Sequence, residues 1–129
     1  MENTNQIGIW MDHSIAYLME FNTMPFEIQI IECDLTVDEK KSNPYRKKTK
    51  NRDIKRKYKY YNQIGNAIIN YDKIILFGPS EAKIDFFDTL SEDERFYKLK
   101  IEIKETDKMN VNQQHAFITQ YFVQQCYMI

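Results

Sequence analysis

Glycine, proline, cysteine and tryptophan are scarce in this chain of 129 residues, which contains three, three, two and one of them, respectively. So few glycines leave no glycine-rich phosphate loop, and neither the Walker pattern nor GxGxxG occurs. Cys33 and Cys126 form no CxxC pair, so we expect reduced, half-buried thiols rather than a disulfide. The two histidines, His13 and His115, have no partner at zinc-ligand spacing. The sequence therefore predicts no metal and no cofactor.

Long hydrophobic runs are missing too. No apolar stretch approaches the roughly 20 residues that cross a bilayer, and the polar stretch from Met1 to Gln6 does not resemble a secretory signal. We therefore expect a cytoplasmic location and no membrane partner. The apolar fraction of 43% and the aromatic fraction of 14% are sufficient for a core, so we expect residues 1–129 to form a single domain.

Negative charge is almost absent from one segment. Between Lys40 and Lys59 there are eleven lysines and arginines and one acidic residue, Asp53, for a net charge of +10. The rest of the chain holds seven basic residues (18 less 11) and 18 acidic residues (19 less one), for a net charge of −11. Such an asymmetry indicates a basic contact element on an acidic body.

Apolar residues alternate near the N-terminus and predict three strands, at about 6–11, 15–21 and 26–33. The short turns between them favour an antiparallel meander. Residues 36–52 are polar and lack apolar periodicity, which predicts a long basic surface loop. From about Arg52 a helical period begins, and we expect its apolar face to include Tyr58, Tyr61, Ile64, Ala67 and Ile68.

The second half of the chain predicts two further strands and two further helices. Residues 73–77 form an apolar run that is typical of a buried central strand, and Pro79 suits the first turn of the helix that follows. A strand is expected at 97–104, and Asn110 with Gln113 forms a capping box for the last helix.

The predicted element order is β-β-β-α-β-α-β-α, which places the chain in the α/β class. It favours a mixed five-stranded sheet with helices on both faces, an RNase H-like arrangement. Because crossovers between parallel strands are right-handed, the fourth strand should lie beside the first, giving the order 3-2-1-4-5.

An RNase H-like fold often carries a two-metal nuclease site, which needs several converging carboxylates. Asp12 follows the first strand, but the first helix has no glutamate and the fourth strand ends in Gly78-Pro79 rather than in an acid. We therefore expect Asp12 to be a turn residue that bonds its own backbone, and we predict no catalytic residue. A metal-dependent nucleic-acid hydrolase around Asp12 and His13 remains an alternative.

The basic segment is the candidate binding site. Lysines and arginines neutralise phosphates and release counterions, while aromatic rings stack on unpaired bases. A solvated loop, or a module that binds an acidic protein, is the other interpretation. The candidate nucleic-acid-binding residues are Lys40, Lys41, Tyr45, Arg46, Lys47, Lys48, Lys50, Arg52, Lys55, Arg56, Lys57 and Lys59.

Three strings carry a family resemblance: IGIWMDHSIAY at 7–17, ILFGPSEAK at 75–83 and DKMNVNQ at 107–113. They resemble a group of small bacterial proteins that look like the middle domain of the archaeal and eukaryotic peptide-chain release factor and of its relative Pelota. The resemblance covers essentially the whole chain. It implies the RNase H-like topology and a role on the ribosome.

The Gly-Gly-Gln loop through which release factors hydrolyse peptidyl-tRNA is absent, and Gln63-Ile64-Gly65 lies within a predicted helix. The chain is in this respect more similar to Pelota, whose middle domain lacks the tripeptide and presents basic residues. The resemblance thus implies a non-enzymatic module whose partner is the ribosome, structured RNA or tRNA. The sequence leaves the oligomeric state open.

Overall fold

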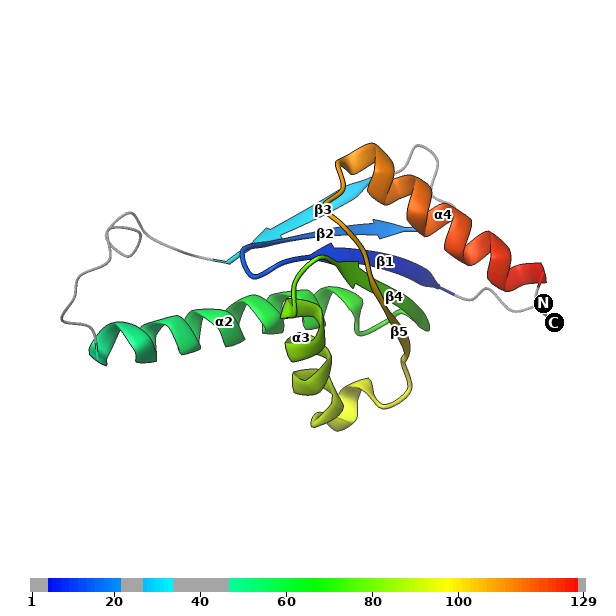
Figure 1. Cartoon of the computed structure of the whole chain (residues 1–129). Coiled ribbons are helices and arrows are strands. Elements are labelled where there is room, and N and C mark those ends of the chain that lie inside the picture. The colour runs from blue at the N-terminus through cyan, green and yellow to red at the C-terminus, as the bar shows by residue number, and fades with distance from the viewer. Residues whose placement is uncertain (1–4, 22–26, 34–46, 128–129) are drawn as a thin grey trace.

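The computed structural model describes residues 5–21, 27–33 and 47–127, with only the backbone described for 47–53 and 126–127. The elements of the described part are shown in Figure 1. They are β1 (Gln6–Met11), β2 (Ile15–Glu20), β3 (Ile28–Glu32), α2 (Lys47–Ile68), β4 (Lys73–Gly78), α3 (Ala82–Ser91), the short 3-10 helix η1 (Glu94–Phe96), β5 (Lys100–Glu105) and α4 (Val111–Tyr127).

The five strands form one mixed sheet in the order β3-β2-β1-β4-β5. The pairs β1–β2 and β2–β3 are antiparallel, whereas β1–β4 and β4–β5 are parallel. Gly78 ends β4 at a φ of 147°, and a Cβ there would lie 2.3 Å from the carbonyl oxygen of Met11. The predicted α/β class and strand order are confirmed.

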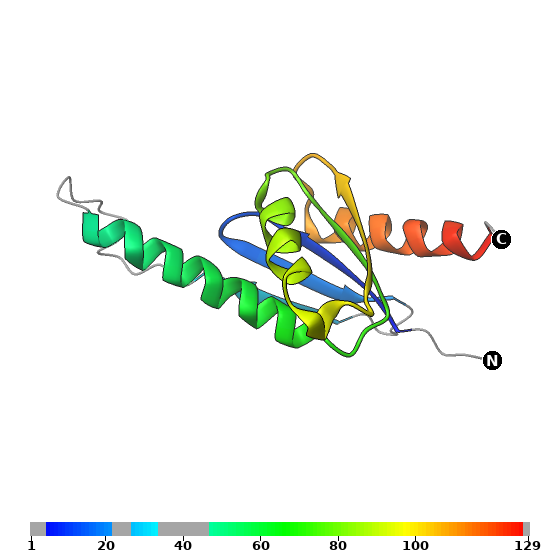
Figure 2. The same ribbon diagram turned by 90° about the horizontal axis from the view of Figure 1, so that it is seen from below.

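Helices cover both faces of the sheet, as predicted (Figures 1 and 2). Because side chains alternate along a strand, β1 contributes Ile9 to one core cluster and Trp10 to the other. The first cluster lies under α2 and α3 and includes Ile64 and Phe86, and the second lies under α4 and includes Phe122. In the described part of the chain, no helix combines the length and hydropathy of a membrane span.

The helix α2 begins at Lys47, five residues before the predicted start at Arg52. The stretch 47–52 was predicted as loop because it lacks apolar periodicity. Lysine and arginine are good helix formers, and a helix needs an apolar stripe only where it packs against the core. The other part of the predicted loop, 36–46, lies outside the described residues.

Two later boundaries also differ from the prediction. The helix α3 begins at Ala82, whose amide donates to the Ser80 hydroxyl at 3.2 Å, so Pro79 lies before the helix rather than in its first turn. The strand β5 begins at Lys100 rather than Tyr97, because Asp93 caps η1 by accepting a hydrogen bond from the amide of Arg95 at 3.0 Å. The predicted capping box is confirmed by reciprocal bonds of 2.9 and 2.8 Å between Asn110 and Gln113.

Candidate functional site

The helix α2 has two parts with different surroundings. Its buried side chains begin at Tyr60 and continue through Tyr61, Ile64 and Ile68, all at most 2% exposed. None of the side chains described at 54–59 is buried. Both views show the N-terminal part of the helix extending past the sheet and past α3 (Figures 1 and 2). We call residues 47–59 the basic arm.

The predicted site residues fall into three groups. Lys40, Lys41, Tyr45 and Arg46 lie outside the described residues. The second group lies on the first turns of α2, where only the backbone is described, and consists of Lys47, Lys48, Lys50 and Arg52. The third group has fully described side chains and consists of Lys55, Arg56, Lys57 and Lys59.

Among the fully described cations, Lys55 and Lys59 are exposed, while Arg56 and Lys57 are half-buried. Lys57 lies at the junction with α3, where its Nζ is 3.2 Å from Oδ2 of Asp85. The same Asp85 oxygen accepts a hydrogen bond from the Tyr61 hydroxyl at 2.9 Å. Burial, together with this hydrogen bond, raises the pKa of Tyr61 above its ordinary value. Asp85 thus joins the base of the basic arm to α3, and Lys57 is partly committed to that contact.

Tyr58 departs from the sequence prediction. It was expected on the apolar face of the helix, yet 44% of it is exposed, and Ile54 one turn earlier is 45% exposed. Tyr58 is four residues from Ile54 and three from Tyr61, so the three form one line along the helix. The line of apolar side chains on α2 therefore continues beyond the part of the helix that packs against the core. Periodicity alone does not show where that packing ends.

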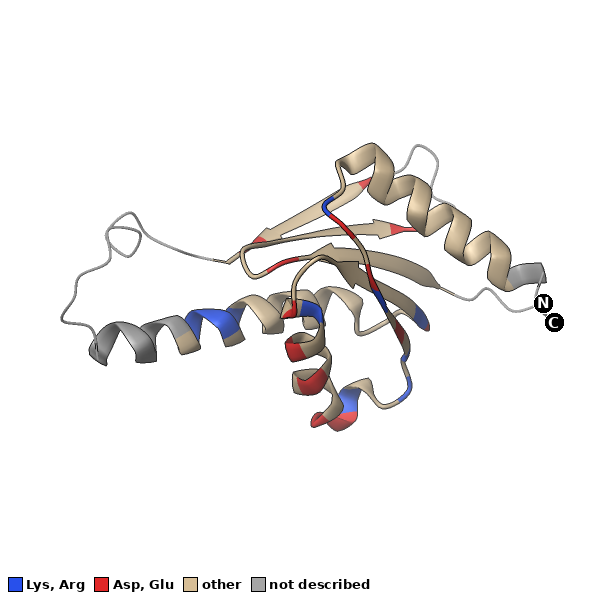
Figure 3. Cartoon of the chain, in the orientation of Figure 1, with Lys and Arg blue, Asp and Glu red and all other residues tan. Residues whose placement is uncertain are grey.

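The charged residues of α3 and η1 are mostly acidic, opposite in charge to the basic arm. Figure 3 shows acidic residues gathered on these two elements and basic residues on the described turns of the arm. An ion pair joins the two surfaces through Lys57 and Asp85. The acidic side chains are Asp85, Asp88, Glu92, Asp93 and Glu94.

Asp12, the centre of the alternative hydrolase, is a turn residue, as predicted. Its Oδ1 accepts hydrogen bonds from the amides of Ser14 at 2.8 Å and Ile15 at 3.0 Å. Its carbonyl oxygen accepts a hydrogen bond from the Tyr60 hydroxyl at 2.9 Å, and this bond connects the β1–β2 turn to α2. Within the described ranges, no group of three or more His, Cys, Asp or Glu residues could hold a metal ion. The described residues give this alternative no convergent ligand set.

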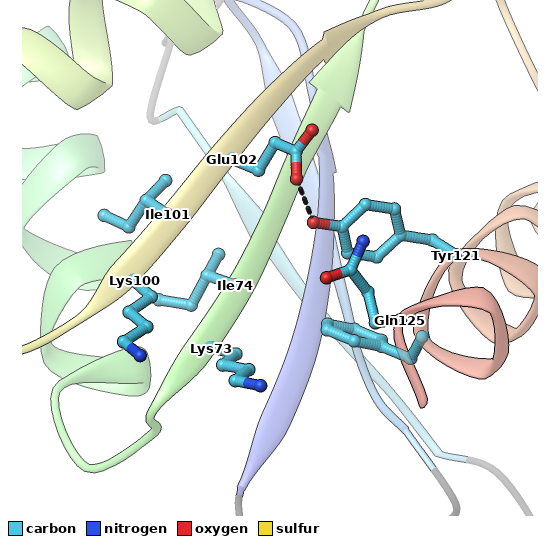
Figure 4. Close-up of a pocket in the computed structure, with 8 residues that line it drawn as sticks. Lys73, Ile74, Lys100, Ile101, Glu102, Tyr121 and Gln125 are labelled. Atoms are coloured by element: carbon cyan, nitrogen blue, oxygen red, sulfur yellow. Dashed lines mark hydrogen bonds between the residues drawn. The ribbon is translucent and has the colours of Figure 1, made fainter. Parts of the chain in front are cut away.

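A pocket of about 320 Å³ lies between β4, β5 and α4 (Figure 4). Lys73 and Lys100 line it together with Glu102. Glu102 accepts a hydrogen bond from the Tyr121 hydroxyl and pairs with Lys104 at 3.4 Å. Because charges of both signs share this pocket, it is a weaker site for an anionic polymer than the basic arm.

No protein-family model and no curated protein matches the sequence. Solved structures do match. Pelota from Archaeoglobus fulgidus aligns with 96% of this chain and 33% of its own, with a TM-score of 0.63 and 11% identity. Pelota in a model of ribosome-bound archaeal Pelota and ABCE1 aligns with 94% of this chain and 33% of its own, with a TM-score of 0.63 and 18% identity.

The archaeal translation termination factor aRF1 aligns with 95% of this chain and 39% of its own, with a TM-score of 0.56 and 14% identity. The chain thus spans about a third of the length of the Pelota structures. At these identities the likeness establishes the fold. The resemblance predicted from the three sequence strings is confirmed at that level.

Proposed function

We propose that this chain is a non-enzymatic RNA- or ribosome-binding module related to the translation termination and rescue machinery. It contacts phosphates through the basic arm. One observation carries the proposal: the basic arm extends past the core, and its described side chains are not buried. Exposed cations outside the core are accessible to a partner, which supports the proposal.

The placement of Lys55 and Lys59 suits a phosphate backbone. Residues four apart on a helix lie on the same side, so these two exposed ammonium groups form a short row. Each phosphate that a cation neutralises releases counterions, which makes binding favourable and strongly salt-dependent. The structures of similar fold support translation as the setting, since one of them is archaeal Pelota on the ribosome.

The test is co-sedimentation of the purified protein with ribosomes and with bulk tRNA across a salt series. The double variant Lys55→Glu/Lys59→Glu should bind at least about tenfold more weakly, with a shallower salt slope, because it loses and repels phosphate contacts. The matched control is Lys98→Glu/Lys108→Glu, which makes the same change of charge at exposed positions outside the arm. It should bind within about twofold of the unmodified protein.

Equal losses in the two variants would mean that only total charge matters and would remove the arm from the proposal. Failure of the unmodified protein to bind RNA or ribosomes at low salt would overturn the proposed function itself.

A protein-interaction module is the second candidate, and the Lys57–Asp85 ion pair favours it. The pair shows that a cation of the arm and a carboxylate of α3 are complementary within one molecule. A second copy could offer the same acidic surface to the arm. Sedimentation of the RNA-free protein over a range of concentrations distinguishes this candidate, because it alone requires self-association or an acidic partner.

A further inference from the structure

The exposed end of the apolar line on α2 carries a more specific inference, which rests on the proposed function. Along this line, exposure rises from 2% at Tyr61 to 44% at Tyr58 and 45% at Ile54. An isolated exposed apolar residue is common on protein surfaces. Here an aromatic ring and a branched aliphatic side chain are adjacent, and both lie on a helix rich in cations.

The Tyr58 ring is held in place by contacts with its neighbours on α2. It meets the Tyr61 ring edge to face, with centroids 6.2 Å apart and planes at 86°. Tyr61 is itself fixed by its hydrogen bond to Asp85 and by the Phe86 ring, whose centroid lies 5.5 Å away. Lys57 Nζ lies 5.2 Å from the Tyr58 centroid. A ring that is already ordered loses little conformational entropy when a ligand stacks on it.

Cations border the ring on its outer side. On a helix each residue turns by about 100°, so Lys55 and Lys59 lie beside Tyr58, on the side away from Tyr61. Both are exposed. An RNA strand whose phosphates contact these two lysines can turn one base toward the Tyr58 ring. In a duplex the base faces are covered by their neighbours, so only an unpaired base has a face to offer.

We propose that Tyr58 is a stacking platform for an unpaired RNA base, and that the basic arm consequently prefers single-stranded RNA to duplex RNA. Lys55 and Lys59 contact the flanking phosphates, and Ile54 extends the apolar surface under the same base or its neighbour. The charge of the arm selects a polyanion, and the exposed ring selects a polyanion with free aromatic faces.

The experiment compares three RNA ligands at one salt concentration: a single-stranded oligoribonucleotide, the same strand annealed to its complement, and the same strand with abasic sites. The unmodified protein should bind the single strand about tenfold more tightly than the other two. Tyr58→Ala should lose about that factor on the single strand and change duplex binding by less than about twofold. Tyr58→Phe keeps the ring and should bind as the unmodified protein does.

The control variant is Tyr97→Ala, which removes a tyrosine that is 65% exposed on a different part of the surface. It should leave all three affinities unchanged. The abasic ligand tests the inference on the unmodified protein, so the result does not depend on whether a variant folds.

Equal binding of the three ligands by the unmodified protein would overturn the stacking platform and leave the proposed RNA binding intact. Binding of none of them, nor of ribosomes or tRNA, would overturn both. Self-association of the RNA-free protein that disappears in Tyr58→Ala would assign the ring to a protein interface and overturn the inference.

Discussion

The C-terminal half of α2 packs Tyr60, Tyr61, Ile64 and Ile68 against the sheet, whereas its N-terminal half extends past the sheet and carries cations. The two halves are consecutive turns of one helix with one backbone geometry. Burial constrains the identity of the residues in the C-terminal half, because a core tolerates few changes of side-chain shape. Few packing contacts constrain the residues of the N-terminal half, so helix propensity has a larger share in that half. Fold and proposed function are therefore carried by separate residues of the same element.

Truncation of the packed half should give the largest effect. Ile64 is fully buried, so Ile64→Ala removes core contacts and leaves a cavity, lowering the free energy of unfolding by about 2–5 kcal/mol. The matched change in the arm, Ile54→Ala, should lower it by less than about 0.5 kcal/mol, because Ile54 is 45% exposed. Urea denaturation of the two variants measures both values. Similar losses would show that the arm is part of the core after all.

A smaller effect is expected from removing the Tyr60 hydroxyl, which connects the packed half of α2 to the β1–β2 turn. Tyr60→Phe deletes the 2.9 Å hydrogen bond to the Asp12 carbonyl oxygen, and this should cost about 1–3 kcal/mol of unfolding free energy because the acceptor loses its buried partner. Tyr58→Phe, in the exposed part, should cost almost nothing.

The same tyrosine predicts a pH dependence. Burial, and then the charge of Asp12, raise the pKa of Tyr60 above its ordinary value of 10.0. The unfolded state therefore releases this proton at lower pH than the folded state does, so the stabilisation is complete below about pH 10 and declines as the pH rises further. Denaturation of the unmodified protein between pH 8 and 11 should show this decline, and Tyr60→Phe should reduce its slope. An unchanged slope would attribute the decline to other groups.

The smallest effect separates two lysines within the basic arm. Lys57 is 38% exposed and pairs with Asp85, whereas Lys55 is exposed. Lys57→Ala should therefore weaken RNA binding by about twofold, less than Lys55→Ala, which should weaken it by about fivefold. Filter binding at low salt measures both. A larger loss for Lys57→Ala would mean that RNA displaces the Asp85 contact.

The strand order was predictable because alternation marks each strand and handedness restricts the crossover. The Asp12 turn and the Asn110–Gln113 box were predictable because their partners are two or three residues away. Lys83 was not, since its burial depends on Glu105, 22 residues later: its Nζ lies 2.7 Å from Glu105 Oε1 and 2.5 Å from the Ser80 carbonyl oxygen. A contact between residues distant in the sequence, such as that of Lys83 with Glu105, could thus not be predicted.

The same limit applies to the candidate site. The cluster of cations was visible in the sequence and the helix was predicted from Arg52, but the first five residues of α2 were missed, because apolar periodicity detects only the part of a helix that packs. Tyr58 was placed on the correct line of α2, yet its exposure depends on where the neighbouring elements end.

The length of the arm has an electrostatic consequence. Residues 47–59 span roughly 18 Å along the helix axis, about twice the Debye length of about 8 Å at physiological ionic strength. The net charge of −11 on the chain outside residues 40–59 would repel an anionic polymer at close range. At the far turns of the arm, dissolved ions screen most of that repulsion. A net-acidic protein can in this way present a cationic surface to a polyanion without neutralising its own body.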